Sequence, residues 1–575
     1  MDSIEVDIWS STATLTTFPD KPTVVPLKGA NTPSIPSWKK TAAQKRSQQA
    51  QLIPLEWRLP PANLLPRNTD EFLHSSGLLT PDEVNITELS STALLQNLAS
   101  SQLTAVQVAR AFCKRAAFAQ QLINCCTEIL FDEALTRAQA LDEHLEQTGR
   151  VVGLLHGLPV SLKDIFDIQG RDSTIGWVAL IDKPAKENSV LAASLLAQGA
   201  VLYVKTNVAQ ALMLSDSYNH IFKQSLNSLN RDLISGGSSG GEGALIAAHG
   251  SIIGVGTDTG GSVRIPAALQ GLYGLKPTGG RVPFDESRKW EFIAPPVAGP
   301  IASDLSTIEL FMEGLLSSEP WHLDPSLLPI PWRKELAAKP SRPLKVGYFT
   351  NDGVVRVQPP NKNAVLKVVS KLKAAGHTVV EWDASDHGDA YQQWVKVTFG
   401  DGGESCRELS AASGEPLIEG VLIGTAEDKL SIDETREAAS LKAEFERSYL
   451  KRWRDTGIDV LITPVQPYVG MRPRKWAASK PYIGYTSHWN WLDYAALTIP
   501  VVPLNITGTP DDEEHGEGDW ATYVPKNESD RLNYEQYDPK LTAGMPVGVQ
   551  VVAPKYGEEM CVAVAKVIKD ILEQA

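Results

Sequence analysis

Hydrophobic positions along the chain change from helical spacing to short continuous runs near residue 150. The stretches "AVQVARAFCKRAAFAQQL" and "FDEALTRAQALDEHLEQTG" place apolar residues three and four positions apart, as on one face of a helix. Thr104 is expected to cap the first helix and Gly149 to end the second. The pattern predicts a helical region before residue 150.

Strand and helix patterns alternate after residue 150. "LPVSLKD" is typical of a buried strand, and "SVLAASLLAQGAVLYVKTN" of a helix that ends at Gly199 before a strand. "ALIAAHG", "SIIGVGTD" and "GGSVRIPAALQGLYGLKPT" then predict a helix, a strand, and a turn followed by a helix and a strand. Such a rhythm indicates a large, centrally buried sheet.

The second half of the chain continues the pattern. "PLKVGYFT", "GHTVVEWD", "DVLITPV" and "ALTIPVVPL" predict strands, and "REAASLKAEFERSYLKRWRD" predicts an amphipathic helix. The aromatic stretch "KWAASKPYIGYTSHWNWLDY" is typical either of a pocket lining or of ordinary packing. Residues 1–60 are expected to form an extended arm leading into a short helix, and the acidic residues 511–519 an exposed insertion.

Composition and charge exclude several classes of protein. The 575 residues are 42% hydrophobic and 21% charged, which is typical of a globular protein. A net charge of -14 argues against a nucleic-acid-binding or anionic-lipid-binding surface. Five scattered cysteines lack metal-ligand or disulfide spacing, and we find no secretory signal or bilayer-spanning segment. We therefore expect a cytoplasmic protein.

The stretch "GGSSGGEGALI", residues 236–246, is the first candidate for chemistry. A phosphate-binding loop is excluded because no lysine follows the glycines. Gly236–Gly240 matches the G-x-S-x-G elbow of serine hydrolases, which needs an Asp and then a His downstream. No downstream histidine has a distinctive setting; those weighed are His322, His377, His387 and His488.

A second glycine pair offers a better explanation. In "GVGTDTGGSVRIPA", residues 254–267, backbone N–H groups could converge on one carbonyl oxygen, as an oxyanion hole requires. The four candidates are Thr259, Gly260, Gly261 and Ser262. Lys163 ends the apolar strand "GLPVSLKD", where burial would favour the uncharged amine that can accept a proton.

The ordered motifs "GLPVSLKD", "GGSSGGEGALIA" and "GTDTGGSVRIPA" resemble the amidase signature family. The resemblance implies that Lys163 is the base, Ser238 a serine after a cis peptide bond, and Ser262 the nucleophile. Their separations of 75 residues (163 to 238) and 24 residues (238 to 262) agree with the family's layout. It further implies an acyl-serine hydrolase of linear amides that uses no metal or organic cofactor.

The resemblance also implies a fold, a domain layout and supporting residues. The fold is α/β, a single large domain with a central mixed, mostly parallel β-sheet covered by helices on both faces. Residues 1–89 would form the N-terminal arm and helices and 90–575 the amidase domain, with a catalytic core at 150–300, a variable region at 320–475 and a closing segment at 476–575. Ser239, Asp258 and Arg264 match family positions and are expected to brace the nucleophile by hydrogen bonds.

The substrate is less directly indicated. The context "NSLNRDLISGGSSGGEGALIA" resembles the fungal acetamidase-type branch, which implies small aliphatic or aromatic primary amides. We expect Leu212, Met213, Trp489 and Trp491 to line the acyl pocket. Alternatives are a fatty-acid-amide, ester or aryl-amide hydrolase, or an inactive binding scaffold. We expect a small-molecule partner and neither a nucleic acid nor a membrane; a homodimer is allowed.

Overall fold

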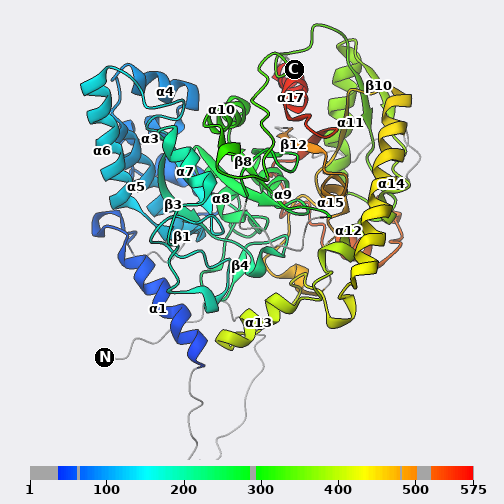
Figure 1. Ribbon diagram of the computed structural model, residues 1–575, viewed down its shortest axis with the longest axis horizontal. Coiled ribbons are helices and arrows are strands. Elements are labelled where there is room, and N and C mark those ends of the chain that lie inside the picture. The colour runs from blue at the N-terminus through cyan, green and yellow to red at the C-terminus, as the bar shows by residue number, and fades with distance from the viewer. Residues whose placement is uncertain (1–35, 61–64, 285–292, 479–481, 502–519, 574–575) are drawn as a thin grey trace, which may run out of the picture. The chain divides into compact units, whose positions relative to one another are not determined.

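A mixed β-sheet forms the centre of the structure (Figure 1). The computed structural model describes residues 36–60, 65–284, 293–478, 482–501 and 520–573. Ser37–Ala575 make one compact unit. The expected arm before residue 36 and the acidic residues 511–519 lie outside the described residues. The α/β architecture predicted from the sequence is confirmed.

Within the described residues, eleven strands make this sheet in the order β1-β3-β2-β6-β8-β7-β12-β13-β11-β9-β10. Parallel ladders join β3, β2 and β6 toward one side and β11, β9 and β10 at the other. Antiparallel pairs connect these two groups and add β1 at the edge. The strands of the sheet are β1 (Cys126–Ile129), β2 (Pro159–Lys163), β3 (Val201–Thr206), β6 (Ile253–Asp258), β7 (Tyr273–Lys276), β8 (Val297–Ala302), β9 (Lys345–Tyr348), β10 (Thr378–Glu381), β11 (Val460–Pro464), β12 (Ala495–Pro500) and β13 (Gly548–Ala553). β4 (Tyr218–Asn219) and β5 (Lys223–Gln224) form a separate hairpin.

Helices pack on both faces of the sheet. α5, α8 and α9 form one group, in which α8 contacts both of the other helices. α10, α11 and α17 form a second group, which contacts β7, β8 and β10 to β13. The helices are α1 (Ser37–Gln51), α2 (Thr69–Ser75), α3 (Pro81–Glu88), α4 (Ser91–Ala99), α5 (Ala105–Ile123), α6 (Phe131–Thr148), α7 (Val190–Ala197), α8 (Gly240–Ala247), α9 (Arg264–Gln270), α10 (Leu305–Leu316), α11 (Pro359–Ala374), α12 (His387–Thr398), α13 (Glu404–Ser413), α14 (Ile432–Thr456), α15 (Gly484–Trp491), α16 (Glu528–Glu535) and α17 (Glu558–Glu573).

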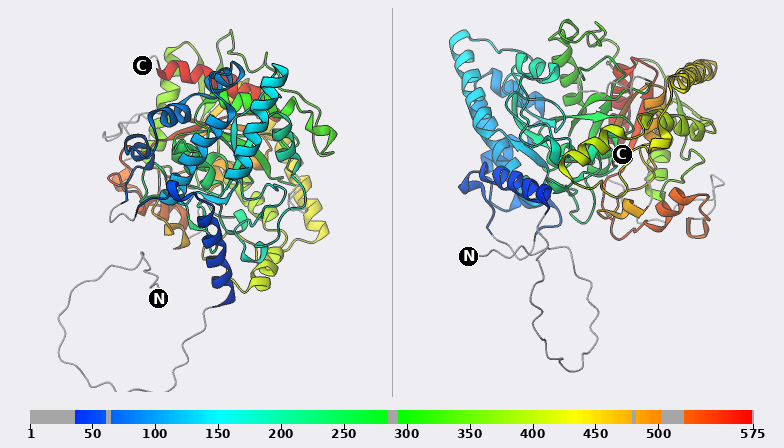
Figure 2. Two further views of the ribbon diagram at one scale, coloured as in Figure 1. Left: turned by 90° about the vertical axis from the view of Figure 1, so that its left-hand side faces the viewer. Right: turned by 60° about the horizontal axis from the view of Figure 1, so that its bottom comes forward.

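Local sequence signals explain where the early helices begin and end. Thr104 caps α5 in a reciprocal pair with Gln107, in which each side chain accepts the other residue's backbone N–H at 3.1 and 2.8 Å. α6 ends at Gly149, which adopts the left-handed φ of +65° that glycine tolerates. These helices gather beside the β1 end of the sheet (Figure 2). Both predicted boundaries are confirmed.

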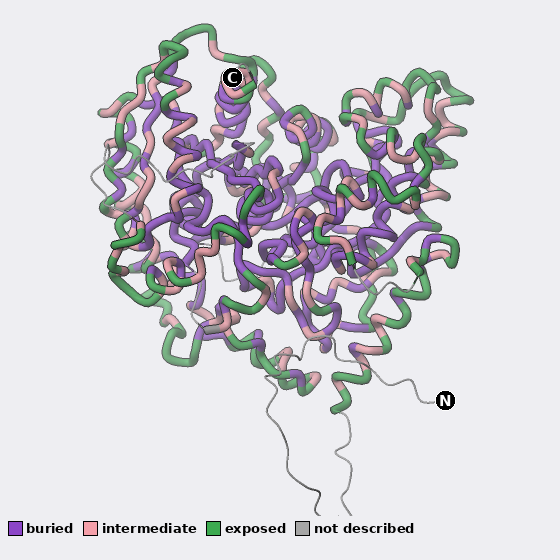
Figure 3. Tube along the Cα trace, turned by 180° about the vertical axis from the view of Figure 1, so that it is seen from behind, coloured by how far each residue is buried: buried purple, intermediate pink, exposed green. Residues whose placement is uncertain are grey.

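The core follows the sheet. Figure 3 shows buried residues running through the middle of the unit and exposed residues along the outer helices. The central strands β2, β6 and β13 are buried along their whole length, as expected for strands covered on both faces. α14 buries few of its residues, so its charge run covers a solvated face as predicted. Across the described residues, no helix is both long and apolar enough to cross a bilayer.

Candidate active site

Lys163 lies at the carboxyl end of the central strand β2. Its side chain is fully buried, and Nζ donates to Ser238 Oγ at 2.8 Å and to Thr257 Oγ1 at 2.7 Å. Thr257 comes from β6, the parallel neighbour of β2. The structure therefore brings together two of the three residues that the sequence places in the catalytic set.

Ser238 lies in a loop that a second serine holds. The peptide bond between Gly237 and Ser238 is cis. Ser217 Oγ lies 3.1 Å from the carbonyl oxygen of Gly236 and 3.2 Å from that of Ser238, and it accepts the N–H of Gly240 at 2.9 Å. Sequence reasoning missed Ser217 because it belongs to a different loop, 21 residues before Ser238.

Ser262 is half-buried in the loop between β6 and α9, which we call the nucleophile loop (residues 259–263). Gly261 has φ +134°, a conformation that side chains rarely adopt, and a Cβ there would lie 2.4 Å from Thr486 Oγ1. Ser239 joins the two serine loops because its N–H donates to the Ser262 carbonyl at 3.3 Å. Within the described residues the Ser262 hydroxyl itself makes no hydrogen bond, neither to Ser238 nor to a histidine.

A buried ion pair braces the nucleophile loop. Asp258 accepts the N–H of Gly261 at 2.8 Å and that of Val263 at 3.2 Å, and Arg264 Nη2 and Nε bind its carboxylate at 2.8 and 3.0 Å. Burial would raise the pKa of Asp258, but the Arg264 charge and its hydrogen bonds lower it to about 2. Arg264 also donates to Asn490 Oδ1 at 2.7 Å, which ties the loop to α15.

Removal of one partner of this ion pair is expected to destabilise the fold strongly. Arg264→Met should lower the free energy of unfolding by about 3–5 kcal/mol, because it leaves the Asp258 charge buried without its partner. Thermal unfolding measures the loss. Arg436→Met is the matched control, since Arg436 is 75% exposed and, among the described residues, pairs only with Asp433 on the surface of α14. Equal destabilisation by both substitutions would refute the bracing role.

The backbone of the nucleophile loop turns its carbonyl groups outward. Trp394 Nε1 donates to the Thr259 carbonyl at 3.0 Å, and Thr486 Oγ1 donates to the Gly260 carbonyl at 2.5 Å. Because C=O and N–H point in opposite directions across a trans peptide, the Gly260 N–H points away from Trp394. Among the described residues, no hydrogen bond engages the N–H groups of Thr259, Gly260 and Ser262, whereas that of Gly261 is bound to Asp258.

A small apolar cavity opens beside Ser262. Its volume is about 20 Å³, and its walls include Leu212 and Met213. Leu212 has φ +61°, a left-handed conformation that is rare for leucine and that often accompanies functional positions. Ile483, from the aromatic stretch weighed as a pocket lining, and Trp394, which was not anticipated from the sequence, also line the cavity.

The two tryptophans expected in the acyl pocket lie elsewhere. Trp491 is buried in the same hydrophobic cluster as Met213 and Trp394, and Trp489 in another, but neither tryptophan lines the cavity. Thr486 and Asn490, four positions apart on α15, face the nucleophile loop, so the residues between and beyond them point in other directions. Trp489 packs instead edge-on against His387 and His488.

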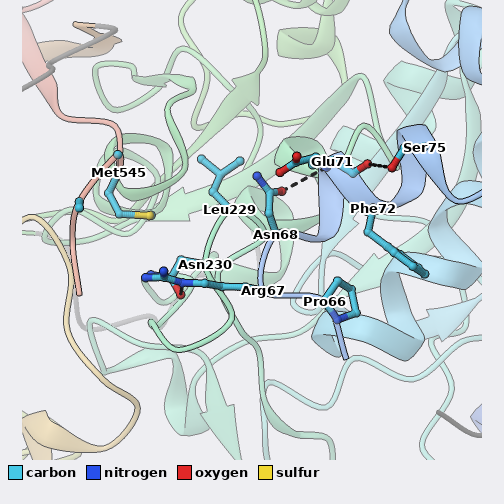
Figure 4. A pocket seen from close by; sticks show the side chains of 11 residues that line it. Pro66, Arg67, Asn68, Glu71, Phe72, Ser75, Leu229, Asn230 and Met545 are labelled. Atoms are coloured by element: carbon cyan, nitrogen blue, oxygen red, sulfur yellow. Dashed lines mark hydrogen bonds between the residues drawn. The ribbon is translucent and has the colours of Figure 1, made fainter. Parts of the chain in front are cut away.

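A second, larger hollow has a volume of about 570 Å³. Arg67, Glu71 and Met545 are among the side chains that line it (Figure 4). It shares no lining residue with the cavity beside Ser262. The Arg67 guanidinium group has a structural role, because Nε donates to Asn230 Oδ1 and Nη2 to the Leu541 carbonyl, both at 3.1 Å. We therefore place the chemistry at the smaller cavity.

Glu242 lies one turn beyond Ser238, at the start of α8. It is fully buried and accepts hydrogen bonds from Ser161 at 2.5 Å and Thr206 at 2.8 Å. Burial raises its pKa to about 8, against the opposing effect of these hydrogen bonds. The carboxyl group is therefore neutral in the folded protein at pH 7.

A neutral Glu242 has a consequence for stability. Between pH 4.5 and about 8 the folded chain keeps a proton on this group that the unfolded chain releases, so its contribution to stability falls as the pH rises. Glu242→Gln removes this effect. As the pH increases across this interval, the free energy of unfolding of Glu242→Gln should therefore rise relative to that of wild type by about 1.4 kcal/mol per pH unit, and its midpoint of thermal unfolding should rise with it. The exposed Glu146→Gln is the control. A gap between Glu242→Gln and wild type that stays constant from pH 5.5 to 7.5 would contradict the neutral carboxyl.

Comparison with known proteins agrees with the motifs and the fold. The sequence profile of the amidase family matches residues 107–562. Acetamidase from Emericella nidulans is 36% identical over 554 residues, covering 93% of this chain and 98% of that protein. Acetamidase from Aspergillus oryzae is also 36% identical, over 552 residues, covering 93% and 99%.

Solved structures extend this similarity. A fatty acid amide hydrolase superposes with a TM-score of 0.86 at 32% identity, covering 93% of this chain and 95% of the other. A bacterial aryl acylamidase of the amidase signature family shares the fold, with a TM-score of 0.68 at 22% identity over 84% and 96% of the two chains. The profile match and these relatives establish that the chain belongs to the amidase signature family of amide-hydrolysing enzymes.

Proposed function

We propose that this enzyme hydrolyses small primary carboxylic amides to a carboxylic acid and ammonia through an acyl intermediate on Ser262. One observation carries the proposal: the fully buried Lys163 amine lies 2.8 Å from Ser238 Oγ, and the Ser238 loop is hydrogen-bonded to Ser262 through Ser239. A buried amine beside a hydroxyl is the arrangement that a lysine base requires.

The first step is acylation. Ser262 Oγ attacks the amide carbonyl while its proton passes to Ser238 Oγ, and Ser238 passes its own proton to the uncharged Lys163 Nζ. The proposal requires rotation about the Ser262 side-chain bond to bring its hydroxyl to Ser238, and within the described residues no hydrogen bond of that hydroxyl opposes the rotation. Such contacts commonly tighten only when substrate is bound.

The negative charge that develops on the carbonyl oxygen needs donors. The N–H groups of Thr259, Gly260 and Ser262 are suited to this role, since no group in the described chain engages them. The Gly261 N–H was included in the expected oxyanion hole, but its bond to Asp258 at 2.8 Å gives it a bracing role in our proposal. Preorganised donors of this kind stabilise the transition state more than the substrate.

The remaining steps return the protons. When the C–N bond breaks, Lys163 gives its proton back through Ser238 to the leaving nitrogen, which departs as ammonia. Water then attacks the acyl-serine and loses its proton along the same path, and collapse of the second intermediate restores Ser262 and releases the acid. The residues named in the site carry every proton transfer.

The nearest alternatives are other acyl groups and leaving groups. The acetamidases among the relatives support small amides, whereas the similar fatty acid amide hydrolase supports long acyl chains. The test is ammonia or amine release from acetamide, longer aliphatic amides, benzamide, indoleacetamide and anilides, with ester cleavage alongside. Hydrolysis of esters with every amide left intact would overturn the proposal in favour of an esterase.

A further inference from the structure

The cavity beside Ser262 ends at α12. We propose that Trp394 on this helix sets the length of the acyl group and limits the enzyme to amides with acyl groups of about two or three carbons. This inference rests on the proposed function, because it takes Ser262 as the atom that holds the acyl group.

The indole ring of Trp394 is fixed against the nucleophile loop. Its side chain is 1% exposed, and Nε1 donates to the Thr259 carbonyl at 3.0 Å. A Cβ on Gly260 would lie 2.7 Å from Trp394 Cζ2 and 3.1 Å from Cη2, so the six-membered ring lies directly over the residue two positions before Ser262. Tyr391, one turn earlier on α12, stacks on the ring with an interplanar angle of 14°.

The cavity that Trp394 and Ser262 both line is small. It holds about 20 Å³, which is close to the space that one water molecule occupies. A methyl group is of similar size, so the methyl of an acetyl group bonded to Ser262 fits without movement of the wall. Each further methylene must displace a side chain.

Trp394 is held more firmly than the unbranched walls of the cavity. Leu212, Met213 and Leu422 are unbranched at Cβ, and methionine in particular adapts to different neighbours, whereas Ile265 and Ile483 are β-branched and stiffer. The indole is held by a hydrogen bond at Nε1, by close packing on Gly260 and by stacking on Tyr391. The ring is therefore the wall that a longer acyl chain meets and cannot push aside.

The test compares acetamide, butyramide and hexanamide. In the wild type, kcat/KM should fall at least about tenfold from acetamide to hexanamide, as expected when added methylenes do not fit a pocket. Trp394→Phe should raise the butyramide-to-acetamide ratio, and Trp394→Leu should raise the hexanamide-to-acetamide ratio at least about tenfold. Ratios measured within one preparation do not depend on the fraction of folded enzyme.

The control is Val397→Ala, which truncates another buried residue of α12 that does not line the cavity; it should leave the ratios unchanged. Wild type that hydrolyses hexanamide as well as acetamide overturns the inference without any variant. Ratios that stay constant in both Trp394 variants also overturn it, while the proposed function stands. Absence of amide hydrolysis in the wild type instead overturns the proposed function.

Discussion

Ser262→Ala should abolish amide hydrolysis, with kcat reduced by about 10⁵- to 10⁶-fold. The substitution removes the only protein atom in the proposed cycle that bonds to the substrate carbonyl carbon. The fold should be retained, because the Ser262 hydroxyl makes no hydrogen bond within the described residues and the backbone of the nucleophile loop is held by Asp258. Ammonia release from acetamide measures the loss.

Two further measurements make this result specific. Hydroxylamine added to wild type should trap the acyl group as a hydroxamate, and Ser262→Ala should form none. Ser228→Ala is the control for the loss of a serine hydroxyl, since Ser228 is buried and does not line the cavity; it should keep wild-type activity. Hydroxamate formation by Ser262→Ala would show that another residue is the nucleophile.

Lys163→Ala should reduce kcat/KM on acetamide by about 10⁴-fold, the upper part of the range for a general base. The loss on p-nitrophenyl acetate should be smaller by at least about tenfold. An amine must be protonated as it leaves, whereas p-nitrophenolate leaves as an anion, so only the amide needs the proton that Lys163 returns. The comparison therefore distinguishes proton transfer from a general loss of structure.

A second buried lysine provides the control for Lys163. Lys276 is fully buried on β7 and donates to the Tyr494 carbonyl at 2.9 Å. Lys276→Met should lower amide and ester hydrolysis in the same proportion, because it affects only the fraction of folded enzyme. An equal loss on both substrates in Lys163→Ala would rule out Lys163 as the source of the leaving-group proton.

The sequence predicts the elements of this fold well because their signals are local. A β-strand of apolar residues, a capping threonine or a terminal glycine acts within a few positions, so β2, α5 and α6 appear where the pattern places them. The order of strands in the sheet is not local. β13 comes last in the chain yet pairs with both β12 and β11, which no short-range pattern specifies.

The same distinction holds at the site. The family resemblance implies that Lys163, Ser238 and Ser262 act together, and the contact of Lys163 with Ser238 agrees with it. Thr257 could have been found, because it lies on the strand paired with β2. Trp394 could not, since it reaches the nucleophile loop from a helix more than 130 residues later, and its sequence neighbours carry no motif.

The connection of Arg264 to residues near the carboxyl end bears on how the enzyme is made. Arg264 donates to Thr486, Asn490 and Gln550, the last of which lies on β13. Gln550 follows Arg264 by 286 residues, so a ribosome adding 5–20 residues per second needs about 15 seconds to a minute to reach it after Arg264 is made. We therefore expect a nascent or prematurely terminated chain that lacks β13 to be inactive and to expose the edges of β11 and β12, which are prone to aggregate.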